Sequence, residues 1–141
     1  MPNPSPETIK KVKQWLTFAD DDLEMASYVI GYKSGAPYRI IAFHAQQCAE
    51  KCLKAYLIYH NIDFPYTHNI RHLLKLCSKH ADWPHTLNQA KELTPYAITA
   101  RYPGEDEEVS ETEAQKAIEI AQQVRNQVRT ELQKLGLDLS E

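Results

Sequence analysis

Apolar residues recur every three or four positions along the first part of the chain. They are Ile9, Val12, Leu16, Ala19, Leu23, Ala26 and Ile30. This spacing puts them on one face of an α-helix. Ser5 is suited to cap the first turn, Pro6 to occupy the first helical position, and Gly31 to follow the last turn in a left-handed conformation. The pattern therefore predicts a long amphipathic helix between Ser5 and Gly31.

A second helix is predicted over residues 38–60, with two adjacent apolar rows. One row contains Ile41, Ala45, Cys48, Cys52, Ala55 and Tyr59, and the other contains Ala42, Ala49, Leu53 and Tyr56. So wide a stripe indicates a helix in the middle of a bundle or at a subunit contact. Its one polar row consists of His44, Gln47, Lys51 and Lys54. We expect this row to face water, a cleft or a partner.

Three more helical segments follow. The third is predicted to be capped by Thr67 and carries Ile70, Leu73, Leu74 and Cys77. The fourth runs through Leu87, Ala90, Thr94 and Ala97, and Pro95 is expected to kink or break it. After a Pro-Gly loop at residues 101–109, Ser110 and Glu113 form a capping box. The last helix then carries Ala114, Ala117, Ala121, Val124, Val128, Leu132 and Leu135.

Five helical segments without a convincing strand predict an all-α fold, an up-and-down antiparallel bundle of four or five helices. We expect a single domain over residues 1–141, with its core at about residues 6–136. The alternating spacing on the first and last helices is typical of nearly parallel packing. These two helices and the second are therefore the predicted walls of the core.

Composition and charge exclude several classes of function. The chain has 141 residues, with 16 Lys and Arg against 19 Asp and Glu, and a net charge of −3. This balance argues against binding to duplex DNA or to an anionic membrane, and no apolar run is long enough to span a bilayer. Neither the P-loop motif GxxxxGK[ST] nor the dinucleotide-binding motif GxGxxG occurs, which excludes nucleotide binding through a P-loop or a Rossmann fold. Three cysteines, without an apolar signal core, predict reduced thiols and a cytoplasmic protein.

Arg101 and Tyr102 are candidate ligand contacts at the end of the fourth helix. An arginine can bind phosphate through two hydrogen bonds, and a tyrosine can stack on a base. The alternative is structural: the arginine would meet the carbonyls at the helix end, and the tyrosine would close the end of the bundle. The acidic run at residues 105–108 is interpreted as a solvated surface.

Other polar residues have structural interpretations. We expect the acids at residues 20–22 to lie on the outer face of the first helix or at its edge, with solvation at the surface as the default. His68 and His72 have a spacing that can chelate zinc, but no third ligand is identifiable, and a His68 side chain packed at the helix start is the preferred interpretation. Cys48 and Cys52 are interpreted as small core residues. We therefore expect no metal and no cofactor.

Several segments together resemble the HEPN domain. They are FHAQQCAEKCLKAYL at residues 43–57, ADDDLEMA at residues 19–26, His68 at a helix start, and ARYPG at residues 100–104. The resemblance runs from about residue 10 to about residue 135, and the order of parts matches the single-domain prokaryotic branch. Proteins of that branch are often encoded beside a minimal nucleotidyltransferase. The resemblance implies a helical bundle, often a homodimer, with roles in nucleotide or RNA binding.

Some HEPN proteins are metal-independent RNases that act as toxins. Their signature is an Arg followed by four to six residues and a His, commonly on a late helix and often with Asn directly after the Arg. Here Arg125 and Asn126 resemble its beginning, yet Thr130, Glu131 and Leu132 occupy the positions where the His would fall. The spacing occurs only from Arg39 to His44, on the second helix. A His can transfer protons at a 2′-hydroxyl, and an Arg can stabilise the transition state.

Two main hypotheses follow from the resemblance. In the first, the chain is a nucleotide- or RNA-binding or partner-docking module that forms a homodimer and associates with a nucleotidyltransferase, as part of a toxin–antitoxin pair. Its expected recognition surface contains Gln47, Glu50, Lys51, Lys54, Arg101 and Tyr102. In the second, it is a metal-independent RNase toxin in which Arg39 and His44 carry out cleavage and basic residues of the third helix hold RNA. A purely structural helical partner is the remaining alternative.

Overall fold

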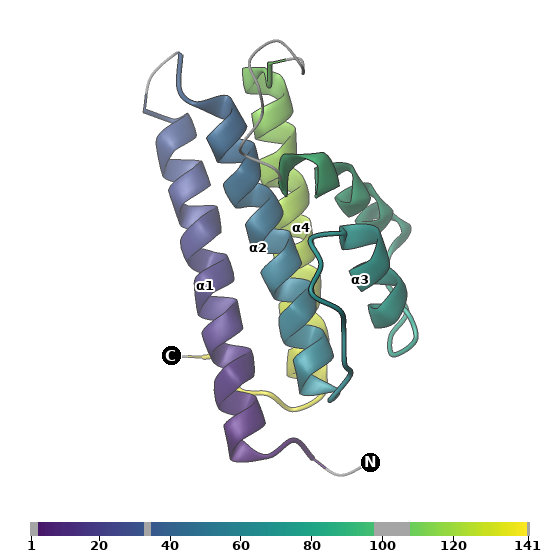
Figure 1. Ribbon diagram of the computed structural model, residues 1–141. Coiled ribbons are helices and arrows are strands. Elements are labelled where there is room, and N and C mark those ends of the chain that lie inside the picture. The colour runs from purple at the N-terminus through teal and green to yellow at the C-terminus, as the bar shows by residue number, and fades with distance from the viewer. Residues whose placement is uncertain (1–2, 33–34, 98–107, 141) are drawn as a thin grey trace.

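The computed structural model describes residues 3–32, 35–97 and 108–140, and within these ranges the chain is helical and has no strand. Three long helices run side by side in antiparallel order, and two short ones pack against α2 at one side of the bundle (Figure 1). The elements are α1 (Pro6–Ile30), α2 (Tyr38–Tyr59), α3 (Ile70–Cys77), the 3₁₀-helix η1 (His85–Ala97) and α4 (Glu111–Lys134). The predicted all-α antiparallel bundle is thus confirmed.

Two predicted helix starts are confirmed by their hydrogen bonds. The Ser5 side chain accepts a hydrogen bond from the Thr8 backbone N–H at 3.1 Å, with Pro6 in the first turn of α1. At the start of α4, Ser110 and Glu113 form the reciprocal capping box. Each bond satisfies a backbone N–H group that has no partner within its helix.

The prediction for Gly31 is wrong. Its φ is −83°, so it is right-handed, and the α1 end is closed by the Tyr32 N–H donating to the Val29 carbonyl. The left-handed role belongs instead to Asn61 after α2 and Gly136 after α4, with φ values of 55° and 97°. Left-handed residues let the chain reverse while later N–H groups bond the last helical carbonyls.

The third and fourth segments also differ from expectation. Asn69, not Thr67, caps α3, because the Asn69 side chain accepts from the His72 N–H while Thr67 accepts from the Asn69 N–H. The fourth segment is a 3₁₀-helix that continues through Pro95 to Ala97, so of the predicted kink or break the break does not occur. Its buried residues are Leu87, Ala90 and Leu93, and their three-residue spacing matches the three residues per turn of that helix.

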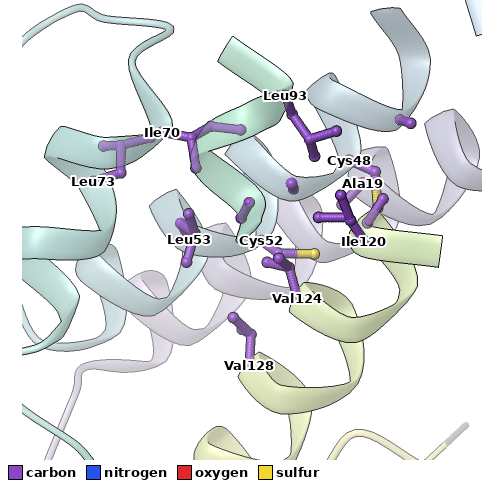
Figure 2. Packing of buried hydrophobic residues seen from close by; sticks show 14 of the residues in the cluster. Ala19, Cys48, Cys52, Leu53, Ile70, Leu73, Leu93, Ile120, Val124 and Val128 are labelled. Carbon is purple, nitrogen blue, oxygen red and sulfur yellow. The ribbon is translucent and has the colours of Figure 1, made fainter. Parts of the chain in front are cut away.

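Helix α2 lies at the centre of the bundle and contacts all four other helices. The apolar core between them includes Leu53 from α2, Ile70 from α3, Leu93 from η1 and Val124 from α4 (Figure 2). Burial within one chain therefore accounts for the apolar width of α2. The thiols of Cys48, Cys52 and Cys77 are free and fully buried in this core, as predicted for Cys48 and Cys52.

Candidate functional site

A partly exposed cluster joins α1 to α2. One carboxylate oxygen of Asp22 lies 2.8 Å from His44 Nδ1, and the other lies 2.6 Å from Lys51 Nζ. Lys51 and His44 are seven residues apart and so lie on the same side of α2. The side chains of His44 and Lys51 are 29% and 24% exposed, whereas Asp22 is 12% exposed. The acid is thus enclosed, and its two partners reach solvent.

The Asp22 carboxylate fixes the chemistry of the His44 ring. An ionised carboxylate can only accept hydrogen bonds, so Nδ1 carries the proton and Nε2 of the neutral ring keeps its lone pair. A histidine oriented in this way is able to take a proton from a hydroxyl and return it. Lys51 adds a positive charge beside the ring, which suits an anionic group of a ligand.

A second polar cluster is buried beside the first. Glu50 Oε1 accepts hydrogen bonds from Gln46 Nε2 at 2.9 Å and from His68 Nδ1 at 2.7 Å, and Glu50 Oε2 accepts one from Lys54 Nζ at 2.9 Å. Gln47 donates to the Gln46 side-chain oxygen at 2.7 Å and so adds to the network. Burial would raise the pKa of Glu50, but the bonds from Lys54, Gln46 and His68 together lower it below its ordinary value. The ionised carboxylate therefore stabilises the fold.

Aromatic rings surround the Lys54 ammonium group. Its Nζ lies 5.8 Å from the ring centre of Trp15, 5.7 Å from that of Phe64 and 5.9 Å from that of Tyr66. Cations are attracted to the faces of aromatic rings at such distances. Lys54 is thus held by Glu50 on one side and by residues from α1 and from the connector after α2.

The polar row of α2 was expected to face water, a cleft or a partner, and this expectation is wrong at Lys54. Lys54 is only 5% exposed and Glu50 only 3%, so their charges are paired inside the bundle. Gln47 is half-buried and bonded to Gln46. Of the row, His44 and Lys51 are the two members with partly exposed charged or titratable groups.

The acids at residues 20–22 were expected on the outer face of α1 or at its edge, with solvation as the default. Asp20 and Asp22 lie at the edge, but both form ion pairs with neighbouring helices. Asp20 pairs with Arg125 of α4, with Nε 2.6 Å from one carboxylate oxygen, and also lies 3.7 Å from Arg129. The hydrogen bond that Arg125 donates to Asp20 raises the pKa of Arg125. Asp22 turns to α2 instead, where it holds His44. Two acids of one short run thus fasten α1 to both neighbouring long helices.

The remaining predicted site residues are Arg39, Arg101 and Tyr102. Arg39 is exposed in the first turn of α2, and His44, five residues later, pairs with Asp22. Residues five apart on a helix are about 140° apart around its axis. Arg101 and Tyr102 lie outside the described residues, and so does the acidic run except for Glu108, which is exposed.

No group of three or more His, Cys, Asp or Glu side chains suited to a metal ion occurs in the described ranges. His68, one of the two histidines whose spacing can chelate zinc, donates a hydrogen bond to Glu50, and its side chain is 44% exposed. The contact that holds the His68 side chain at the start of α3 is thus a hydrogen bond to a buried acid. None of the described helices combines the length and the apolar character that a membrane span requires.

Sequence reasoning missed Asp22, Gln46 and the role of His68. A signal for Asp22 was present, because it is three residues after Ala19 and four before Ala26, both fully buried. An acid at that position borders the apolar stripe and cannot lie on the outer face. Gln46 and His68 gave no comparable signal, since their partner, Glu50, is itself enclosed only by tertiary packing.

The buried pair of Glu50 and Lys54 provides a stability test. Replacing Lys54→Met leaves the Glu50 carboxylate buried without its cation, and we expect a loss of about 3–5 kcal/mol in the free energy of unfolding. The double variant with Glu50→Gln should lose less than the sum of the two single changes, because it removes both charges. Urea denaturation of all four proteins measures these values.

A surface pair is the matched control. Lys134 is 65% exposed and pairs with Glu131 on α4, so Lys134→Met should cost no more than about 1 kcal/mol. Because the folded-state pKa of Glu50 is lowered, the coupling is complete above its ordinary pKa and declines as pH falls through the lowered value. Additive single and double variants at neutral pH would contradict a coupled buried pair.

A family model and two solved structures place the chain among known proteins. A HEPN domain model matches residues 12–131. The solved structure of ST0689, an archaeal HEPN homologue, is 31% identical with a TM-score of 0.68, covering 86% of this chain and 97% of that one. TT1696 from Thermus thermophilus is 28% identical with a TM-score of 0.73, covering 85% and 97%. Among curated proteins, no significant match was found. With the family model matching most of its length, this chain belongs to the HEPN domain family.

Proposed function

We propose that this HEPN protein is a nucleotide- or RNA-binding module that acts with a nucleotidyltransferase partner in a toxin–antitoxin pair. The observation that carries the proposal is the Asp22–His44–Lys51 cluster. It presents an oriented imidazole and an ammonium group at a partly exposed junction of two helices. The ammonium group is complementary to a phosphate, and Nε2 of the neutral ring can accept a hydrogen bond from a ribose hydroxyl. Arg101 and Tyr102 remain predicted contacts of the same ligand.

An exposed apolar stripe on α1 supports the proposed homodimer. Phe18, Met25 and Tyr28 are 55%, 51% and 74% exposed, and Tyr32 just beyond the helix is 73% exposed. Their steps of seven, three and four residues place them on one face, opposite the core. Apolar side chains gathered in this way favour burial against another chain, and a second copy of this chain is the proposed occupant. Phe18 is one turn before Asp22, so a docked copy would border the His44 cluster.

Nucleotide binding tests the proposal. We expect calorimetric titration with AMP, ATP and GTP to give a measurable affinity for at least one of them. Lys51→Gln should weaken it about tenfold or more, because a charge-assisted hydrogen bond to phosphate is lost. Lys116→Gln removes the same charge from an exposed position on α4 and should change the affinity little.

The opposite outcome is equally clear. No heat with any nucleotide from the folded wild-type protein would rule out the nucleotide site and leave docking to the nucleotidyltransferase as its function. That docking would be measured with a purified minimal nucleotidyltransferase, by light scattering on a size-exclusion column. Equal affinities of Arg101→Ala, Tyr102→Ala and wild type for both nucleotide and enzyme would contradict the assignment of these two residues.

Metal-independent RNA cleavage is a second candidate, and the hydrogen bond from His44 to Asp22 favours it. Asp22 orients the ring so that Nε2 is able to remove a proton from a 2′-hydroxyl, while Arg39 stabilises the charge that develops on the phosphate. Because residues 39 and 44 diverge around the helix, convergence on one phosphate requires a long arginine side chain or a second copy of the chain.

An RNA degradation assay without added metal tests this candidate. We expect His44→Ala to lower the cleavage rate about 100-fold or more, since general acid–base catalysis is lost. Arg39→Ala and Asp22→Ala should lower it as well, the first through the transition state and the second through the orientation of His44. Equal cleavage by wild type and all three variants would show that the activity comes from elsewhere.

A further inference from the structure

A groove of about 400 Å³ lies between α3 and η1, away from the His44 cluster. Its lining residues are Arg71, Leu74, Lys75, Ser78, Asn88 and Lys91. The two short helices that form it pack side by side at one edge of the bundle, where α1 does not reach (Figure 1). No residue of α3 or η1 takes part in the Asp22–His44–Lys51 cluster. The groove is therefore a separate feature of the surface.

The groove is positively charged. Half of its lining residues are cations, and none is an acid. Arg71 and Lys75 are one turn apart on α3, and Lys91 contributes from η1. All three are exposed, and within the described part of the chain none of them forms an ion pair. Glu92, next to Lys91, lines a different groove against α4.

The lining indicates which kind of anion fits. Pockets for small ligands are commonly lined by aromatic side chains, and the centres of protein interfaces are enriched in them. Here Leu74 is the one apolar lining residue, and no aromatic ring is present on which a base could stack. Ser78 and Asn88 add neutral hydrogen-bonding groups, which commonly accompany Arg and Lys at nucleic-acid phosphates. The chemistry thus suits a chain of phosphates whose bases point outward.

We propose that this groove binds the phosphate backbone of single-stranded RNA without reading its sequence. Arg71 and Lys75 bind neighbouring phosphates along α3, and Lys91 binds the strand from the opposite wall. The choice of RNA rests on the proposed function, but the groove extends it to a second surface. The mononucleotide titration addresses Lys51 alone, so the two sites succeed or fail separately.

Fluorescence anisotropy with a labelled single-stranded oligouridylate tests the groove. The probe is titrated with wild-type protein and with the triple variant Arg71→Gln/Lys75→Gln/Lys91→Gln over a range of salt concentrations. We expect the variant to bind the probe about tenfold or more weakly. The plot of log affinity against log salt has a negative slope, and the variant should make it shallower by about 2, because three phosphate contacts are lost.

The matched control is Lys10→Gln/Lys11→Gln/Lys116→Gln, which removes three exposed cations elsewhere. It should leave both the affinity and the slope close to wild type. Circular dichroism and thermal melting establish that both triple variants are folded, which all six exposed positions should allow.

Four results would overturn the proposal. The first is absence of binding by the wild-type protein, and the second is unchanged binding by the groove variant. The third is an equal loss in both triple variants, which would indicate diffuse attraction between charges. The fourth is unchanged RNA binding by the groove variant together with loss of its binding to a poly-glutamate peptide. That result would make the groove a docking surface for an acidic protein.

Discussion

Enclosure of α2 by the other four helices is the constraint on which the structure depends. A polar group removed from water costs free energy unless it is hydrogen-bonded, and a buried charge costs more. Helix α2 nevertheless carries polar side chains over a broad sector. Each of the buried ones is matched by a partner within the chain: Glu50 collects three hydrogen bonds, and Lys54 is held between that carboxylate and aromatic rings.

The same constraint explains how α1 is placed. Asp20 and Asp22 lie on opposite borders of the apolar stripe of α1, because two residues advance about 200° around a helix. One acid therefore reaches Arg125 on α4, and the other reaches His44 and Lys51 on α2. The ion pairs on the two sides fix the rotation of α1 about its own axis. They also give His44 a defined orientation, which a solvated histidine would lack.

The fold was largely predictable because its signals are local. The apolar rows predict the helices, and the caps at Ser5 and Ser110 depend on residues three positions away. The site was less predictable, because its contacts join residues distant in the chain: Asp22 is 22 residues from His44 and 29 from Lys51. The burial of Lys54 likewise depends on Trp15 and on the connector after α2. Periodicity on one helix does not predict which side chains face it from another.

The functional account depends on one bond, the hydrogen bond between Asp22 and His44. It converts an ordinary histidine into a ring with a defined tautomer, beside a cation and at the edge of the exposed α1 stripe. In the nucleotide-binding proposal Lys51 holds a phosphate while Nε2 accepts a hydrogen bond from a ribose hydroxyl, and in the RNase alternative Nε2 moves a proton. Both require Nε2, and not Nδ1, to be the nitrogen that faces a ligand.

Nitrogen-15 chemical shifts of the His44 ring test this requirement most directly. Labelled wild-type protein and the Asp22→Ala variant would be compared at a pH where the ring is neutral. The account predicts the Nδ1–H tautomer in the wild type and a shift toward the Nε2–H tautomer in the variant, because the carboxylate that holds the Nδ1 proton is removed. An Nε2–H ring in the wild type, or shifts that do not respond to Asp22→Ala, would contradict it.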